Sequence, residues 1–316
     1  MGKPQIIVSG SIAIDRIMTF KGHYRDLIEP AKLHVLSVSV LVESAETAQG
    51  GIGANISHNL AGLGEKPVLL GSVGEDAREY VNDLESRGID TSSVHFSKLG
   101  TASFNVLNDA EGNQVGGFYP GAMSDADSLT FKPWAGQDAL FWVAAHDPIA
   151  MRRQTDECAA GKLRLGYDPG QQVSNVTGDD LKAGIEAAEI LMINEYELEV
   201  VLSKTGLTVE ELRAKVPIFI TTKGEKGSEI AGTKVDTPLQ IASVAPSSLV
   251  DPGGAGDAYR GGFLYGYLRQ WDLTKCGQLG AVLASLVIEQ MGPQIKISPV
   301  AIAERYKSKF NEEITL

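Results

Sequence analysis

Short apolar runs and longer amphipathic stretches alternate along most of the chain. Apolar runs of about four to eight residues are typical of buried strands, whereas apolar residues spaced three and four apart are typical of helices. The strands expected on this basis are Gln5–Ser9, Val68–Gly71, Leu140–Ala144, Arg164–Tyr167, Ile190–Ile193 and Pro217–Thr221. The helices expected are Asp76–Arg87, Met151–Gly161, Leu181–Ala188, Gly277–Gln290 and Val300–Phe310. This alternation predicts an α/β fold with a mainly parallel sheet.

Two segments, 16–49 and 99–123, break the alternation. The strands expected there are Ile17–Phe20, Val35–Glu43, Thr101–Asn108 and Gln114–Tyr119, with hairpin-turn residues at Asp109–Asn113. We expect the two strand pairs to pack side by side as a lid inserted into a single domain, residues 1–316. A lid would keep water away from a transferable phosphate.

The stretch Val250–Phe263 carries the clearest chemical signal. Gly253, Gly254 and Gly256 allow backbone N–H groups to approach a ligand, and Asp257 follows where helical spacing begins. A helix start binds anions through its unpaired N–H groups, and the same field favours an ionised Asp257, as a general base requires. The alternative is that Asp257 is only a helix N-cap and the glycines only a turn.

Three further glycines lie inside the helix that follows, at Gly261, Gly262 and Gly266. Each costs about 1 kcal/mol relative to alanine in a helix. Their presence predicts that another backbone or a ligand approaches this helix closely.

A second glycine-rich stretch, Gly50–Asn55, opens an earlier helix. Asn55 stands where a dinucleotide-binding motif has its third glycine, so a Rossmann assignment is weak. Close approach to a substrate, with Asn55 donating and accepting hydrogen bonds, suits these residues, although a capped turn is the alternative. Asp15 follows the first strand, where a carboxylate either binds a ligand or occupies a turn.

Two loops in the second half follow strands. Asn194 and Glu197 open a helix, where acidic residues are common, but they also suit an outer-shell magnesium site. The loop 222–227 either contacts phosphate through Thr222 and backbone amides or is a hairpin turn.

Composition and charge exclude several classes of protein. The 316 residues are 43% apolar and 22% charged, which is ordinary for a globular chain. The net charge of −12 argues against nucleic acid or an anionic membrane surface as the main partner. No apolar run reaches the ~20 residues of a membrane helix, and no signal-peptide pattern is present. Two cysteines and five histidines form no disulfide or zinc pattern, so we expect a cytoplasmic protein.

Five motifs, in order, resemble those of the ribokinase-like (PfkB-type) carbohydrate and nucleoside kinases. They are Gly50–Asn55, Val73–Asp76 with Gly88–Thr91, Asn194-x-x-Glu197, the loop 222–227 and Asp251–Asp257. The resemblance implies a three-layer α/β/α core with a mainly parallel sheet and a small β-strand lid. It also implies transfer of the γ-phosphate of ATP, with Mg²⁺, to a substrate hydroxyl.

The resemblance implies a role for each matched residue. Asp257 would remove the hydroxyl proton, while amides at Gly254, Ala255 and Gly256 hold the developing negative charge. The sugar would bind residues Asp15, Gly50, Gly51 and Asn55. The cofactor-binding residues would be Asn194, Glu197, Thr222, Gly224 and Gly227, with Glu197 reaching Mg²⁺ through water. Asp251 is the candidate ligand of K⁺, although Gly253 stands where the family often has threonine.

The stretch from Asp251 to Gly262, together with Phe118–Met123, resembles the adenosine-kinase-like branch. The base of a nucleoside needs an apolar wall, and the candidates are Phe104, Phe118, Tyr119 and Met123. The alternative is that these residues fill the lid's own hydrophobic contact. Ile52 replaces a lysine that is frequent in ribokinases.

We therefore expect phosphorylation of a nucleoside, adenosine to AMP. A ribokinase- or fructokinase-like sugar kinase is the alternative, followed by a non-catalytic sugar or nucleoside sensor. A nicotinamide oxidoreductase lacks its dinucleotide fingerprint. Exposed lid strands would favour pairing of two lids in a homodimer.

Overall fold

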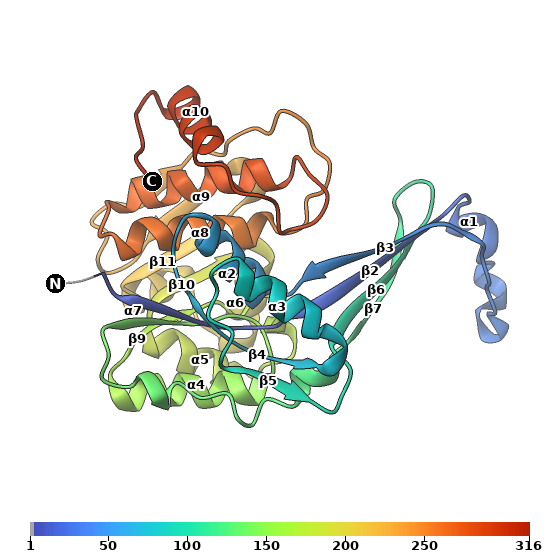
Figure 1. Cartoon of the computed structure of the whole chain (residues 1–316), viewed down its shortest axis with the longest axis horizontal. Coiled ribbons are helices and arrows are strands. Elements are labelled where there is room, and N and C mark those ends of the chain that lie inside the picture. The colour runs from blue at the N-terminus through green and yellow to red at the C-terminus, as the bar shows by residue number, and fades with distance from the viewer. Residues whose placement is uncertain (1–2) are drawn as a thin grey trace.

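The computed structural model describes residues 3–316 as a large sheet covered by helices, with a small sheet projecting from it (Figure 1). The large sheet has the order β13-β12-β11-β10-β9-β8-β1-β4-β5. Its strands are β1 Gln5–Ser9, β4 Val68–Gly74, β5 Val94–Ser97, β8 Ala139–Val143, β9 Arg164–Tyr167, β10 Ala188–Asn194, β11 Ile218–Thr222, β12 Ser228–Ala231 and β13 Leu239–Ile241. Pairing is parallel from β5 to β11, whereas the pairings of β11 with β12 and of β12 with β13 are antiparallel. The predicted, mainly parallel α/β fold is confirmed.

Side chains of successive strand residues enter two different cores, because a strand alternates its faces. Ile6 and Val8 of β1 belong to one core, and Ile7 belongs to the other. The helices on the first face are α2 Ile52–Gly62, α3 Arg78–Ser86, α8 Ala255–Leu268, α9 Leu273–Val287 and α10 Pro299–Phe310. The helices on the second face are α4 Pro148–Gly161, α5 Gly178–Ala187, α6 Glu195–Thr205 and α7 Val209–Lys215. The three-layer core is therefore confirmed.

The small sheet forms the lid and has the order β3-β2-β6-β7. Its strands are β2 Ala13–Phe20, β3 Val42–Gly50, β6 Ala102–Asn108 and β7 Gln114–Tyr119. The central pair, β2 and β6, is parallel, so the two predicted strand pairs do pack side by side. Helix α1, Tyr24–Leu27, and a 3₁₀ helix, Pro30–Val35, lie at the tip, far from the helical layers (Figure 1).

Two expectations for the lid are wrong. The strand expected at Val35–Glu43 is not formed: residues 36–41 have no regular structure, and β3 begins at Val42. This edge strand is polar and mostly open to solvent, so it lacks the apolar signal of a buried strand. Asp15 lies inside β2, paired with Ala48 and Phe104, and not at the exit of β1.

Among residues 3–316, no helix is both long enough and apolar enough to cross a membrane.

A glycine of β9 should not tolerate a side chain. A Cβ at Gly166 would lie 2.0 Å from Cε3 of Trp142, which is fully buried. We expect Gly166→Ala to lower the free energy of unfolding by about 1–3 kcal/mol through overpacking, as measured by urea denaturation. Gly117→Ala in β7 is the matched control, because no atom lies within 4 Å of its added Cβ. Equal losses of stability in the two variants would contradict this account.

Candidate active site

Helix α8 begins with a glycine that no other residue could replace without strain. Gly254 is its N-cap and has a φ of 75°, in the left-handed region, and no side chain among the described residues caps the helix. The first intrahelical bond runs from the N–H of Ala258 to the carbonyl of Gly254, at 2.9 Å. The N–H groups of Ala255, Gly256 and Asp257 precede it, so the helix start can bind an anion.

Asp257 is the third residue of α8, so the interpretation of Asp257 as an N-cap is wrong. Its Oδ2 accepts a hydrogen bond from Nδ2 of Asn55 at 2.8 Å. Burial raises the pKa of Asp257 to about 6, although Arg260 and Asn55 oppose this shift. The expected effect of the helix start on ionisation is thus outweighed by burial, but Asp257 is still mostly ionised above pH 7.

A buried ion pair that the sequence did not reveal lies beside Asp257. Arg260, one turn further along α8, donates from Nε and Nη2 to both carboxylate oxygens of Asp168. Asp168 directly follows β9. A Cβ at Gly256 would lie 2.7 Å from Nη1 of Arg260, so this glycine admits the guanidinium beneath the first helical turn. Burial lowers the pKa of Arg260, but the carboxylates around it, Asp168 above all, raise it by more than this. The net shift of the pKa is therefore upward.

Glycines bring α8 close to its neighbouring helices, as the sequence predicted. A Cβ at Gly261 would lie 2.5 Å from the Cβ of Asn59, one turn after Asn55 in α2. A Cβ at Gly262 would lie 2.8 Å from the carbonyl oxygen of Leu279, in the backbone of α9. The approach of α2 allows Asn55 to reach Asp257.

The expected sugar-binding residues lie together at the base of the lid. A Cβ at Gly50 would lie 2.7 Å from Oδ2 of Asp15, so the carboxylate packs directly over this glycine. Gly51 has a φ of 95°, and its carbonyl accepts the N–H of Asn55 at 2.8 Å. Burial, followed by repulsion from Asp251, raises the pKa of Asp15 to about 6.

One face of the lid sheet combines this carboxylate with aromatic rings. Asp15 of β2 is paired with Phe104 of β6, which is paired with Phe118 of β7, and paired residues share a face. Tyr119 is one residue further along and therefore lies on the opposite face. Met123 is buried in a small apolar cluster, so of these candidates Phe104 and Phe118 best fit an exposed wall.

The expected cofactor residues meet at the carboxyl ends of neighbouring strands. Asn194, which ends β10, is the register partner of Thr222, which ends β11. Asn194 and Glu197 form a reciprocal capping box for α6, with both hydrogen bonds at 2.8 Å. The two residues thus open the helix, as the sequence predicted, and within residues 3–316 the second carboxylate oxygen of Glu197 accepts no hydrogen bond. Burial raises the pKa of Glu197.

Gly224 and Gly227 shape a tight connection between the antiparallel strands β11 and β12. The N–H of Lys223 donates to the carbonyl of Gly227 at 2.7 Å, so the hairpin interpretation is confirmed. Asp251 likewise organises its own loop, accepting from the N–H of Gly253 at 2.8 Å and that of Gly292 at 3.0 Å.

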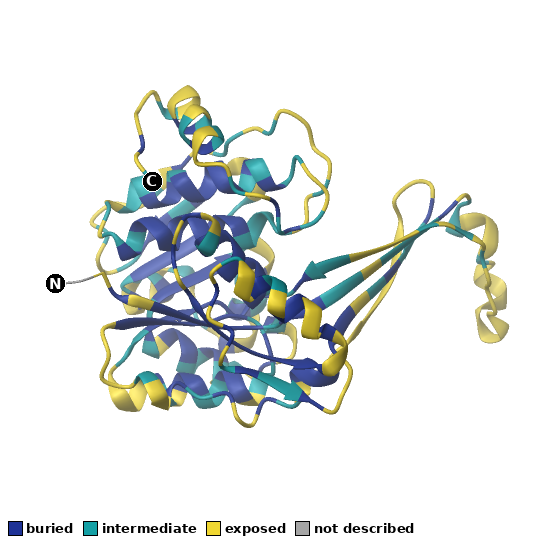
Figure 2. Cartoon of the chain, viewed as in Figure 1, coloured by how far each residue is buried: buried dark blue, intermediate teal, exposed yellow. Residues whose placement is uncertain are grey.

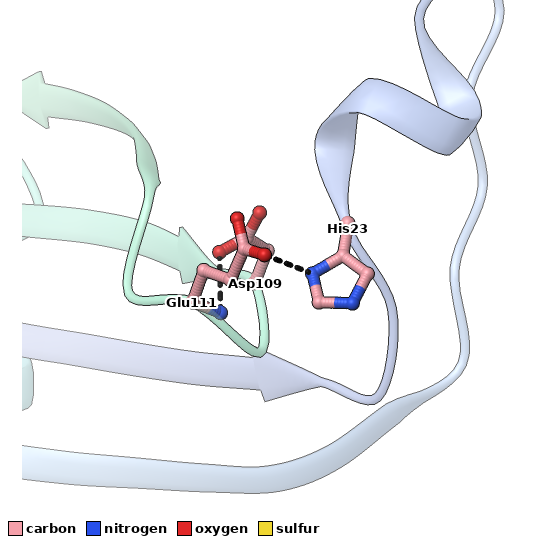
Figure 3. A group of neighbouring side chains, drawn as sticks. All are labelled: His23, Asp109 and Glu111. Atoms are coloured by element: carbon pink, nitrogen blue, oxygen red, sulfur yellow. Dashed lines mark hydrogen bonds and ion pairs between the residues drawn. The ribbon is translucent and has the colours of Figure 1, made fainter.

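A separate group with metal-ligand chemistry, His23, Asp109 and Glu111, lies near the lid tip (Figure 3). Asp109 already accepts from three backbone N–H groups and from the amide of Asn113, and these bonds overcome its burial and lower its pKa to about 2. Glu111 is paired with Arg25 at 2.8 Å. These contacts fasten the tip to the β6–β7 turn and leave little capacity to bind a metal ion.

Comparison with known proteins gives a consistent result. Residues 5–300 match the pfkB family carbohydrate kinase. The chain is 31% identical over 264 residues to a nucleoside kinase of Methanocaldococcus jannaschii, covering 83% of this chain and 86% of that protein. It is 30% identical over 315 residues to a nucleoside kinase of Methanothermobacter thermautotrophicus, covering 98% and 97%.

A solved structure is similar throughout. The nucleoside kinase of Burkholderia thailandensis in complex with inosine matches with a TM-score of 0.87 at 30% identity, covering 98% of this chain and 100% of that one. The fold, the motifs and these similarities agree with the resemblance found in the sequence. The chain belongs to the PfkB family of carbohydrate kinases and is a phosphotransferase that uses an alcohol group as acceptor.

Proposed function

We propose that the protein transfers the γ-phosphate of ATP to the hydroxymethyl group of a nucleoside, converting adenosine to AMP. The observation that carries this proposal is the row Asp15, Phe104 and Phe118 on one face of the lid sheet. A carboxylate can accept hydrogen bonds from the ribose diol while aromatic rings pack against the base. A free sugar has no base, so it would leave the aromatic rings without a partner. Similarity to nucleoside kinases, one of them in complex with inosine, supports the same substrate class.

Asp257 is the proposed base. Its carboxylate takes the proton of the hydroxymethyl group as the new bond between that oxygen and the γ-phosphorus forms. The bond from the γ-phosphorus to the bridging oxygen of ATP breaks, and ADP leaves. The N–H groups at Gly254, Ala255 and Gly256 stabilise the negative charge on the transferred group.

Mg²⁺ is the proposed metal, and it would neutralise charge on the phosphates. Glu197 suits a water-mediated contact, because it is buried and one of its oxygens accepts no hydrogen bond within the described residues. Thr222 and the backbone of Gly224 and Gly227 are proposed to contact ATP. Asp251 is the proposed K⁺ ligand, although both of its oxygens already accept backbone N–H groups.

A panel of acceptors tests the substrate class. We expect ADP release with adenosine or inosine to exceed that with ribose or fructose by at least about tenfold in kcat/KM, because each sugar lacks the contacts to the base. A coupled ADP assay measures this at fixed MgATP. Turnover with free sugars alone would favour the sugar-kinase alternative, and nucleoside binding without turnover would favour the sensor.

Replacement of the base tests the mechanism. We expect Asp257→Asn to lower kcat by about 10²–10⁴-fold while nucleoside binding persists, because the amide cannot take a proton. In the unsubstituted enzyme, kcat/KM should fall as the pH drops through about 6, since both Asp257 and Asp15 then become protonated. Stopped assays across pH 5–8 and calorimetric titration with nucleoside provide the measurements. Activity of D257N close to that of the unsubstituted enzyme would rule out Asp257 as the base.

We also propose that the lid joins two copies of the chain. The apolar residues exposed at its tip are Leu27, Leu33, Val35, Leu36, Val38 and Leu41. They belong to the exposed segment that projects from the body in Figure 2. A surface of this kind is typical of a contact between proteins.

Sedimentation velocity tests the proposed dimer. We expect the unsubstituted protein to sediment as a dimer and Leu41→Glu to sediment as a monomer. Leu41 is 93% exposed in the single chain, and the glutamate that replaces it would place an unpaired charge in the dimer interface. Val300→Glu on α10, at 67% exposure, is the matched control and should leave the dimer intact. A monomeric unsubstituted protein at micromolar concentration would overturn the proposal.

A further inference from the structure

A hydrogen-bond network connects the active site to the base of the lid through Gln294, in the loop after α9. The Nε2 atom of Gln294 donates to Oδ1 of Asn55 at 2.9 Å and also to the hydroxyl of Tyr80. The Oε1 atom of Gln294 accepts from Nη1 of Arg87 at 2.9 Å. The Tyr80 hydroxyl donates to the carbonyl of Gly50 at 2.9 Å.

Two groups that cannot exchange roles determine the direction of every bond in this network. The guanidinium of Arg87 can only donate, and the carbonyl of Gly50 can only accept. Gln294 must therefore turn its oxygen to Arg87 and its amino group to Tyr80 and Asn55. Since the oxygen of Asn55 is then occupied, its amino group faces outward to Asp257.

Arg87 is itself held in place. Arg87 directly follows α3 and forms an ion pair with Asp83 of that helix, and it donates to Oε1 of Gln49 at 3.0 Å and to Nδ1 of His58 at 2.9 Å. Because His58 accepts at Nδ1, its Nε2 carries the proton and donates to the carbonyl of Ile295 at 2.7 Å. Burial lowers the pKa of His58, consistent with a neutral ring. The loop that carries Gln294 is thus fixed on both sides.

We propose that Gln294 is a positioning residue, which makes Asn55 present an N–H group, and not its oxygen, to the carboxylate of Asp257. A donor at this place stabilises the ionised carboxylate, the form that can accept a proton from the substrate. The inference rests on the proposed role of Asp257 as base. Gln294 acts through Asn55.

Among residues 3–316, no side chain other than Asn55 donates a hydrogen bond to the carboxylate of Asp257. The charges whose fields reach it are Arg260 on its own helix, Asp168 after β9 and Glu197 on α6. Helix α2 faces it with the neutral Asn55, while α9 packs against a different side of α8. The orientation of the Asn55 amide is therefore a separate control on its ionisation.

The variant Gln294→Glu separates positioning from folding. Glutamate keeps an acceptor for Arg87 but cannot donate to Asn55. The Asn55 amide should then turn over and direct its oxygen at Asp257, which disfavours the ionised carboxylate. We expect the acid limb of kcat/KM to move up by about one to two pH units, with activity recovering at high pH.

Gln294→Met and a control complete the kinetic test. Methionine adds no charge, so a smaller upward shift in the same direction would exclude a simple effect of the new carboxylate. Gln278→Met is the matched control, because it removes another hydrogen bond between glutamine and tyrosine, that with Tyr306, elsewhere in the protein. It should lower the melting temperature without moving the acid limb. Stability loss without any shift in both Gln294 variants would overturn the proposal.

A direct titration distinguishes this inference from the proposed catalytic role. Carboxyl ¹³C spectra of aspartate-labelled protein report the pKa of Asp257, whose signal is identified by its absence in D257N. A higher pKa in Gln294→Glu and Gln294→Met supports the positioning role even if D257N proves active. An unchanged pKa in both variants contradicts that role even if D257N is inactive.

Discussion

The buried pair of Arg260 and Asp168 fixes the position of the helix on which the proposed chemistry depends. Removing two charges from water is costly, and the cost is offset here because both carboxylate oxygens meet the guanidinium. Asp168 directly follows a central strand, while Arg260 lies one turn beyond Asp257. The pair therefore holds the start of α8 against the carboxyl ends of the central strands. This contact fixes the positions of the unpaired N–H groups and of the Asp257 carboxylate.

Burial at this edge also has a thermodynamic cost. Asp15 and Asp257 each bind a proton more tightly in the folded chain than in the unfolded one, since burial raises both pKa values to about 6. Between the ordinary pKa of an aspartate and this value, the free energy of unfolding falls as the pH rises. The N–H group of Asn55 and the charge of Arg260 limit this loss for Asp257. The burial that gives Asp257 the proton affinity needed by the proposed chemistry thus lowers the free energy of unfolding at neutral pH.

Most core elements could be predicted from the sequence, because buried strands such as β8 and β10 contain continuous apolar runs. The β3 strand could not, since an exposed edge strand held by its backbone has no apolar signature. For the site, the glycine motifs located Asp257 and Asn55. Nothing local to Asp168 or Gln294 revealed their partners, which lie 92 and 239 positions away along the chain. Such contacts arise only when strand ends and loops assemble.

One of the connections between the two sheets, that from β1 to β2, has a mechanical consequence. Only residues 10–12 separate β1 from β2, and three residues span at most about 10 Å, so this link has almost no slack. If the lid rotated about this link, it would move as a lever whose fulcrum lies at the carboxyl end of β1. Asp15 lies close to the fulcrum and Leu41 near the far end, so the same rotation displaces the tip much more than the carboxylate. A force applied at the tip would therefore act on Asp15 with a large mechanical advantage.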